Sequence, residues 1–331
     1  MEKVSPQLKD VRSEEVVAGT FVPVSLESLC TDTVTNFKIY VLTESEKEPV
    51  LYRGENLQFT ERVKKRLLEH DVERVYIQGA DQDKYQEYVE QNLDRIVRDD
   101  RIQTRAKAQI VYSSATFLME KLFKKPRVGK NIRRCEQLVR NTVGFVLRDE
   151  KAFRNLLAVT SYDYYTYTHS INVHIFSVAL AQKLGLGDMQ DLVVLGTGAL
   201  LHDVGKSIID RSIIAKRGLL NDKEWAVIKK HPAYGTQILR ETGGISEECY
   251  AIVSQHHERC DGSGYPEGLT ADKIHKYAKV SAIADVFDAM TTQRVYRDAA
   301  GTFTALQMMK NEMSAGLDPN IFREFVQLMG Q

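Results

Sequence analysis

The chain has 331 residues, of which 43% are hydrophobic and 27% are charged, enough for one large or two medium globular domains with packed cores. Lys plus Arg and Asp plus Glu balance at 45 each, so no net charge draws the chain to duplex nucleic acid or to an anionic membrane. No apolar stretch approaches the length of a membrane span, and the charged N-terminus lacks the apolar core of a signal peptide.

Residues 1–95 predict a small α+β domain. Four segments carry β-branched and aromatic runs with turn residues between them, as strands do: FVPVSLESL, NFKIYVL, PVLYRG and ERVYIQG. Helical spacing at Val63, Leu67 and Leu68 predicts a helix before the last of these strands. We expect this domain to be regulatory or dimerising.

Residues 96–150 predict connecting helices. From about Tyr85 to about Lys125 the sequence contains neither Gly nor Pro, which predicts one long helix, and Pro126 and Gly129 then interrupt the pattern before a second helix. The apolar face of the first helix either pairs with a second subunit in a homodimer or packs within the chain. That face consists of Ile102, Ala106, Ile110, Ala115, Leu118 and Leu122.

Residues 151–331 predict an all-α domain with short loops, and this region carries the candidate chemistry. Seven of the eight histidines lie between residues 169 and 275. They include an adjacent His-Asp pair, His202 and Asp203, and an adjacent His-His pair, His256 and His257. Imidazoles and carboxylates together suit iron, manganese, zinc or cobalt. The four cysteines form no CxxC pair, which argues against a zinc ribbon and fits a reducing cytoplasm.

The run ALLHDVGK predicts a helix whose last turn presents His202 and Asp203, with Gly205 as its C-terminal stop. An adjacent His and Asp can serve two metals with the carboxylate bridging, and two metals can stabilise the oxygens of a phosphoryl group. Lys206 lies just beyond and has two readings. It neutralises a phosphate, or it complements the helix C-terminus.

Four motifs, in this order and spacing, closely resemble the HD-GYP family, a bacterial branch of the HD phosphohydrolases. They are HDVGK, KHPAYGTQIL, HHERCDGSGYPEGL and IADVFDAMTTQRVYR, and the resemblance covers roughly residues 150–325. It implies an all-α HD-GYP catalytic domain that follows the smaller N-terminal α+β domain and the connecting helices. It also implies metal-dependent hydrolysis of cyclic di-GMP to pGpG or onward to GMP, in bacterial second-messenger signalling.

The resemblance also implies the metal ligands, with Asp203 as the bridging carboxylate and with Asp203 and Lys206 as the catalytic residues. The ligands carried over are His169, His202, Asp203, His231, His256, His257 and Asp285. For His231, the proline that follows it can open a helix and leave the imidazole at its N-terminal edge.

The expected number of metals is two. Family members with three metals carry a glutamate four residues before the first histidine ligand, where this chain has Tyr165. A phenol is a poor replacement for a carboxylate here, and Asp163 lies six residues before that histidine. The family's binuclear members are associated with iron or manganese.

The loop DGSGYP predicts a structure close to the substrate. Gly262 and Gly264 permit tight turns near a ligand, Tyr265 can stack or hydrogen-bond beside it, and Pro266 completes the motif. In the family this loop is also linked to signalling-protein partners. The alternative is a structured turn between two helices.

Arg294 and Arg297 match family positions that bind substrate phosphates or guanine, which suits the bidentate geometry of arginine. Nine helical steps from Asp285 would point Arg294 to the opposite side. The assignment therefore requires the helix to end near Thr291 or Thr292.

Asp288 lies one turn after Asp285 and is grouped with the substrate-binding residues, as a base or a hydrogen-bond partner. Three histidines are not expected to be ligands. His174 is rotated away from the first ligand by five helical steps, His275 precedes a helix and is expected to be exposed, and His70 lies in the other domain.

Three alternatives stay open at this point. The first alternative is that the substrate is cyclic GMP-AMP, because the residues that contact the base, and not the metal ligands, decide between the two substrates. The second alternative is that the chain is a weakly active receptor that binds a cyclic dinucleotide or a partner protein. The third alternative, a nucleotidase of the broader HD superfamily, is disfavoured by DGSGYP.

Overall fold

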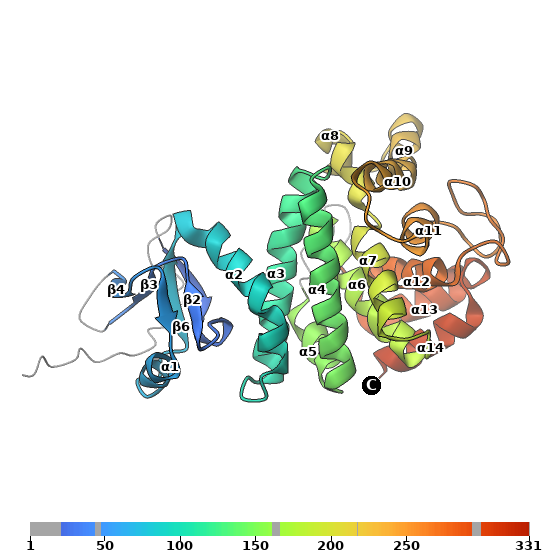
Figure 1. Cartoon of the computed structure of the whole chain (residues 1–331). Helices are drawn as coiled ribbons and strands as arrows, with labels where there is room; N and C mark the ends of the chain where they lie inside the picture. Colours follow the sequence, from blue (N-terminus) through green and yellow to red (C-terminus); the bar gives the residue numbers. More distant parts are fainter. Residues whose placement is uncertain (1–20, 44–47, 161–165, 217, 293–298, 331) are drawn as a thin grey trace, which may run out of the picture. The chain divides into compact units, whose positions relative to one another are not determined.

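The computed structural model describes residues 21–43, 48–160, 166–216, 218–292 and 299–330 (Figure 1). Its contacts divide the chain into two compact units, Met1–Ser114 and Ala115–Gln331, and each is described by itself. The division falls inside one helix, α3 (Thr104–Lys124), whereas the sequence placed domain boundaries near residues 95 and 150. Among the residues that the structure describes, no helix combines the length and the apolar character needed to cross a bilayer.

The first unit contains two antiparallel sheets. One has the strand order β1-β6-β3-β4, with Phe21 opposite Gln78 and Ser25 opposite Arg74, and the other pairs β2 with β5. The strands are β1 (Phe21–Ser25), β2 (Thr33–Thr35), β3 (Ile39–Val41), β4 (Val50–Arg53), β5 (Leu57–Phe59) and β6 (Arg74–Gln78). Together with the helices among the described residues of this unit, they confirm the predicted α+β domain.

Aromatic side chains connect these strands to α2 (Gln82–Arg98). Phe37 is fully buried and meets the rings of Tyr85 and Tyr88 edge-on at 5.7 and 5.5 Å. The Tyr85 hydroxyl donates to the Ser28 hydroxyl at 2.9 Å, so its polar end is satisfied inside the core. Helix α1 (Glu61–Leu68) contains Val63, Leu67 and Leu68, whose spacing predicted a helix, and Thr60 is its N-cap.

The single helix predicted from Tyr85 to Lys125 is wrong. The structure ends α2 at Arg98 and begins α3 at Thr104. Asp99 makes the break, because its carboxylate accepts hydrogen bonds from the backbone and guanidinium of Arg101 and its carbonyl accepts from the Ile102 amide. An aspartate that bonds its own neighbouring backbone stabilises a turn without any Gly or Pro.

The apolar face of α3 has its side chains inside the folded chain. Ile102, which precedes the helix, and Ile110, Leu118 and Leu122 within it are all 7% exposed or less. This burial favours packing within the chain over pairing with a second subunit.

Among the described residues of the second unit, the regular elements are helices, apart from one isolated bridge between Asp261 and Thr270, which confirms the predicted all-α domain. Its further helices are α4 (Gly129–Arg148), α5 (Ala152–Val159), α6 (Thr166–Lys183), α7 (Met189–Leu201), α8 (Arg211–Ile214), α9 (Asp222–Ile228), α10 (His231–Thr242), α11 (Glu247–Gln255), α12 (Lys276–Thr291), α13 (Thr302–Glu312) and α14 (Pro319–Met329). A 3-10 helix, η3 (Val204–Ile208), follows α7.

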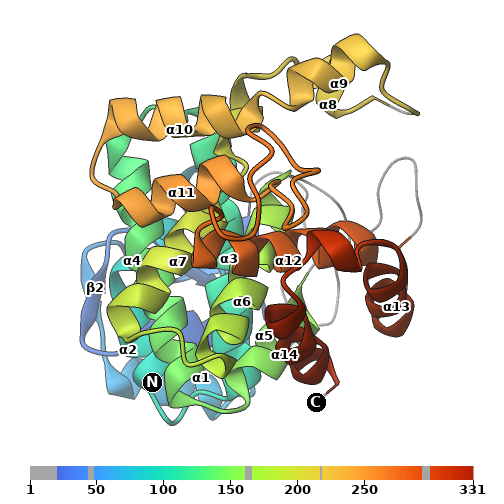
Figure 2. The ribbon, with the colours of Figure 1, turned by 90° about the vertical axis from the view of Figure 1, so that its right-hand side faces the viewer.

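Helices α6 and α7 form the centre of this unit. α6 packs on α7 and on α12, and α7 also packs on α4 and α11 (Figure 2). Every residue from Thr168 to Ala181 is buried, as expected for a helix surrounded by others. Phe176 of α6 meets the rings of Phe287 and Phe325 at 5.3 and 6.2 Å. Polar side chains on α6 and at the end of α7 are therefore held inside the domain.

Candidate metal centre

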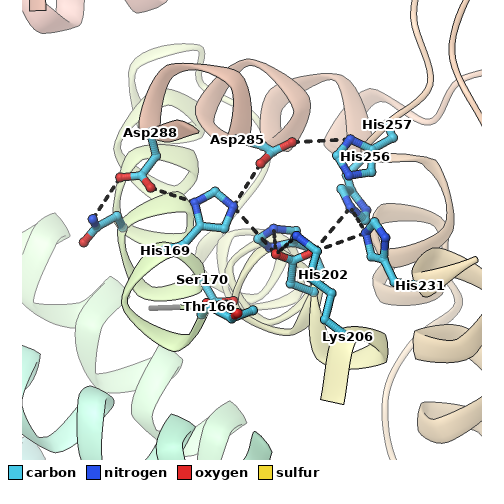
Figure 3. Close-up of polar contacts among 12 residues, drawn as sticks. Thr166, His169, Ser170, His202, Lys206, His231, His256, His257, Asp285 and Asp288 are labelled. Atoms are coloured by element: carbon cyan, nitrogen blue, oxygen red, sulfur yellow. Dashed lines mark hydrogen bonds and ion pairs between the residues drawn. The ribbon is translucent and has the colours of Figure 1, made fainter. Parts of the chain in front are cut away.

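The seven predicted metal ligands come from five helices and lie close together. Figure 3 shows the labelled histidines and Asp285 pointing toward one another. Four lie where the chain leaves α7 and α11, two as C-caps and two directly after them, and one opens α10 immediately before its first-turn proline, as predicted. The other two project from within α6 and α12. By element, they are His169 from α6, His202 and Asp203 after α7, His231 at the start of α10, His256 and His257 after α11, and Asp285 from α12.

Two groups of these side chains are arranged so that each could hold a metal ion, and the groups share Asp203. The first is His169, His202 and Asp203, and the second adds His231, His256 and His257 to Asp203. Within each group the ligand atoms lie no more than 4.8 Å apart.

The two oxygens of Asp203 face different groups. Oδ2 lies 3.7 Å from His169 Nε2 and 3.5 Å from His202 Nε2. Oδ1 lies 3.2 Å from His231 Nε2 and 3.9 Å from His256 Nε2. A carboxylate placed in this way can bridge two neighbouring cations.

Asp285 spans the same two groups from the α12 side. Its Oδ1 lies 3.0 Å from His169 Nε2, and its Oδ2 lies 3.6 Å from His257 Nδ1. The two acidic side chains therefore sit between the imidazoles.

Three of the histidines are held in one tautomer by the backbone. In each, Nδ1 lies within hydrogen-bond distance of the carbonyl three residues earlier, and because a carbonyl only accepts, Nδ1 carries the proton. The Nε2 lone pair of each ring is then free to bind a metal. The pairs are His202 with Ala199 at 2.7 Å, His231 with Ile228 at 2.8 Å and His256 with Val253 at 3.0 Å.

This arrangement leaves acceptors facing acceptors. The Nε2 atoms of His231 and His256 are 3.0 Å apart, and neither can donate to the other when both Nδ1 atoms are protonated. Within the described chain, His202 Nε2 and Asp203 Oδ1 are buried without a hydrogen-bond partner. Each unsatisfied buried group costs about 1–3 kcal/mol. Cations satisfy all of these atoms at once, so the residues fit a metal centre with nitrogen and oxygen ligands.

The protonation states also suit metal binding. Burial alone would raise the pKa of Asp203, but the ammonium of Lys206, 2.7 Å from Oδ2, and the neighbouring His202 hold that pKa well below its usual value. Burial lowers the pKa values of His256 and His257 well below the usual value for imidazole. An ionised carboxylate therefore lies beside the neutral imidazoles of His256 and His257.

Gly205 does not end a helix in the predicted way. It lies inside η3 with a negative φ, and a Cβ at this position would stand 2.0 Å from the carbonyl oxygen of His231 and 2.5 Å from the amide nitrogen of Gly235. The absence of a side chain lets η3 approach the backbone of α10 closely. This contact brings His231 next to Asp203.

Asp288 contacts the centre through His169. His169 Nδ1 donates to Asp288 Oδ2 at 2.7 Å, and the Asn172 amide donates to Oδ1 at 2.8 Å. The side chain of Asp288 is 2% exposed and both oxygens are engaged. Of the roles predicted for it, the geometry favours a hydrogen-bond partner that orients His169 over a residue that touches substrate.

Replacing Asp288 by Asn is expected to weaken metal binding and hydrolysis about 10- to 100-fold, the usual effect of losing the carboxylate behind a metal-bound histidine. The amide has one acceptor and cannot hold His169 and Asn172 as the carboxylate does. Metal titration and steady-state kinetics on the same preparation measure the effect. Unchanged metal affinity would contradict the orienting role.

His174 packs away from the centre, as predicted. It is 2% exposed, and its Nδ1 lies 3.0 Å from the carbonyl oxygen of Gly196. Burial lowers the pKa of His174 from 6.5 to about 4.

Between about pH 6.5 and pH 4, a proton binds His174 in the unfolded chain but not in the native one. The native state should therefore lose about 3 kcal/mol of stability from this group as the pH falls through that window. Urea unfolding of the chelator-treated chain and of a His174→Gln variant, from pH 7 to pH 4.5, tests this. The variant should show the shallower pH dependence, and parallel curves would be the contrary result.

Two other histidines also lie outside the cluster. His275 is half-buried and not exposed as expected, because its imidazole accepts the Tyr277 amide as the N-cap of α12. His70 follows α1 in the first unit, as predicted.

The DGSGYP loop lies against the centre. The ring of Tyr265 stacks on that of His257, with centroids 4.6 Å apart and planes 27° apart. Gly264 is required by close approach, since a Cβ there would lie 2.3 Å from the amide nitrogen of Arg259. Gly262 has a φ of +79°, which favours glycine.

Sequence reasoning missed the residue that holds this loop in place. Glu258 is 2% exposed, and its carboxylate accepts the backbone amides of Glu267 at 2.7 Å and of Leu269 at 2.8 Å. Its position directly after the adjacent histidines was the available signal.

Helix α12 ends at Thr291, as the assignment of the two arginines required. Arg294 and Arg297 themselves, and also Asp163 and Tyr165, lie outside the described residues.

The fold and the site together define a helical domain with adjacent His/Asp groups able to hold metals. A family model described as "HD domain" matches residues 151–321. The chain therefore belongs to the HD domain family, and its motifs place it in the HD-GYP branch.

Named relatives carry the same resemblance. A Pseudomonas aeruginosa cyclic di-GMP phosphodiesterase is 34% identical over 67% of this chain and 54% of its own length. A Vibrio cholerae 3'3'-cGAMP-specific phosphodiesterase is 35% identical over 48% of this chain and 34% of its own length. The chain thus spans about half of the first relative and a third of the second.

A solved structure shows the same fold. It is an HDG"Y"P protein from Bdellovibrio bacteriovorus, with a TM-score of 0.67 and 22% identity, covering 94% of this chain and 100% of that one.

Proposed function

We propose that this chain hydrolyses a cyclic dinucleotide, with cyclic di-GMP as the first candidate, to pGpG or onward to GMP in bacterial second-messenger signalling. Two transition-metal ions, iron or manganese, serve as cofactors. The observation that carries the proposal is the position of Asp203, whose two oxygens face two different groups of imidazoles. The names of the relatives support the substrate class.

The residues around the metal centre have different roles in the proposed hydrolysis. When bound, the metal pair supplies an activated water nucleophile and electrostatic stabilisation of the phosphodiester. Asp203 and Asp285 balance the charge of the cations, and Asp288 keeps the His169 ring oriented toward them. Lys206, beside Asp203, adds a positive charge where the phosphoryl oxygens gain negative charge.

The substrate side of the proposal involves Tyr265, Arg294 and Arg297. Burial raises the pKa of Tyr265, so its phenol stays protonated and can donate a hydrogen bond at the edge of the centre. The arginines contact phosphate or guanine.

Cyclic GMP-AMP is the second candidate substrate. Relatives named as 3'3'-cGAMP-specific phosphodiesterases match 40–48% of the chain. The metal ligands do not discriminate between the two substrates, so the comparison of turnover decides.

The decisive experiment is metal quantitation on the full chain, followed by product analysis with cyclic di-GMP and with cyclic GMP-AMP. We expect hydrolysis by the iron- or manganese-loaded chain and its loss in a His202→Ala variant. Bound metal without any turnover would contradict the enzyme and favour the weakly active receptor.

The remaining assignments are also proposals. The four cysteines are free, which suits a reducing compartment such as the cytoplasm. We assign a regulatory or dimerising role to residues 1–95 and a signalling-protein contact to the loop that contains Tyr265.

A further inference from the structure

Helices α8 and α9 form an arm that has no core of its own. Among its described residues, 211–216 and 218–228, none is buried. Figure 2 shows the arm extending past one end of α10. The arm is held by polar contacts, since Lys216 pairs with Glu224 at 2.6 Å and Asn221 caps α9. The exposed side chains of this arm can therefore contact a ligand without disturbing a hydrophobic core.

The chain's only tryptophan lies on this arm. Trp225 of α9 is 44% exposed, although burying so large an aromatic side chain would normally stabilise the fold. A single exposed apolar residue is common on protein surfaces. The position of Trp225 is unusual because its ring lies edge-on to the Tyr265 ring, with the centroids 6.2 Å apart.

Tyr265 connects the tryptophan to the metal centre. It stacks on His257 at 4.6 Å, so only one ring separates Trp225 from a predicted metal ligand. Lys229, one turn after Trp225, places its ammonium 5.6 Å from the tryptophan ring and 5.5 Å from the tyrosine ring. Two aromatic faces and a cation thus lie together at the edge of the centre.

We infer that Trp225 and Lys229 form a subsite that binds one purine base of the cyclic dinucleotide. The inference rests on the proposed function. In a cyclic dinucleotide one sugar joins each phosphate to a base, so a phosphate held at the metal centre keeps a base close to it. The rings of Tyr265 and Trp225 lie at the edge of that centre. Every purine has an aromatic face that can stack on an exposed indole ring. Lys229 donates to the O6 and N7 acceptors of guanine or to a phosphate oxygen.

Trp225→Ala should raise the KM for cyclic di-GMP about 10-fold or more, as expected when a stacked base loses its platform, and should change kcat less than KM. Trp225→Phe should recover most of the loss. Leu219→Ala is the matched control, because Leu219 is 92% exposed on the same arm. That variant should keep the parental KM.

Binding is measured without turnover by titrating the metal-loaded chain with a slowly hydrolysed phosphorothioate of cyclic di-GMP. The fluorescence of Trp225, the sole tryptophan, should be quenched as the ligand binds.

The outcomes of these experiments distinguish the base-binding subsite from the proposed hydrolytic function. If the chain hydrolyses cyclic di-GMP while the KM of Trp225→Ala and the fluorescence stay unchanged, the subsite is overturned and the proposed function stands. If the fluorescence is quenched without any hydrolysis, the subsite stands and the proposed function fails. If the analogue neither binds nor is hydrolysed, both are overturned.

Discussion

Asp203→Asn is expected to reduce hydrolysis by at least about 10³-fold, the scale of losing a metal's stabilisation of the transition state, and to lower the bound metal per chain. The substitution keeps the shape of the side chain but removes the charge that lies between both imidazole groups. It also leaves Lys206 beside a neutral amide. Elemental analysis and steady-state kinetics on the same preparation measure both effects.

Asp188→Asn is the matched control. Asp188 caps α7, the helix that leads to the site, and asparagine caps helices as well as aspartate does. This variant should keep its metal and its activity. A fully metal-loaded, active Asp203→Asn protein would contradict the bridging role.

Gly205→Ala is expected to have the second large effect. The new methyl group would stand 2.0 Å from the His231 carbonyl oxygen and 2.5 Å from the Gly235 nitrogen, and backbone cannot rotate away as a side chain can. Overpacking of this kind costs about 1–3 kcal/mol or more. Relief requires η3 and α10 to separate, which moves His231 away from Asp203. We therefore expect both lower stability and loss of metal from the second group.

Gly144→Ala is the control for this prediction, measured by the same thermal or urea unfolding. Gly144 lies within α4 and its new Cβ would meet only the end of Met189 at 3.8 Å. Alanine there should stabilise the chain by about 0.5–1 kcal/mol through helix propensity. A Gly205→Ala protein that is as stable and as metal-rich as the parent would show that the close contact is dispensable.

The break between α2 and α3 could not be predicted from the local sequence. The stretch has no Gly or Pro, and only the specific bonding of Asp99 to Arg101 and Ile102 ends the helix. Aspartate is tolerated in helices and in turns alike, so its type alone does not decide between them.

His231 and Gly205 illustrate the same limit for the site. The motif around His231 predicted a ligand at a helix start, and the structure brings that imidazole to Asp203. The reason for Gly205 was predicted wrongly, because the backbone it must accommodate belongs to another helix.

The amino-acid sequence by itself determined the helical class of the second unit, the α+β character of the first and the types of the ligand residues. Helical periodicity and metal-ligand chemistry are local properties, and motifs of adjacent residues carry them. Only the tertiary structure decided which oxygen of Asp203 faces which imidazoles, that Glu258 holds the loop, and that Trp225 lies beside Tyr265. Those contacts join residues far apart in the chain, and the packing of whole helices sets the distances between them.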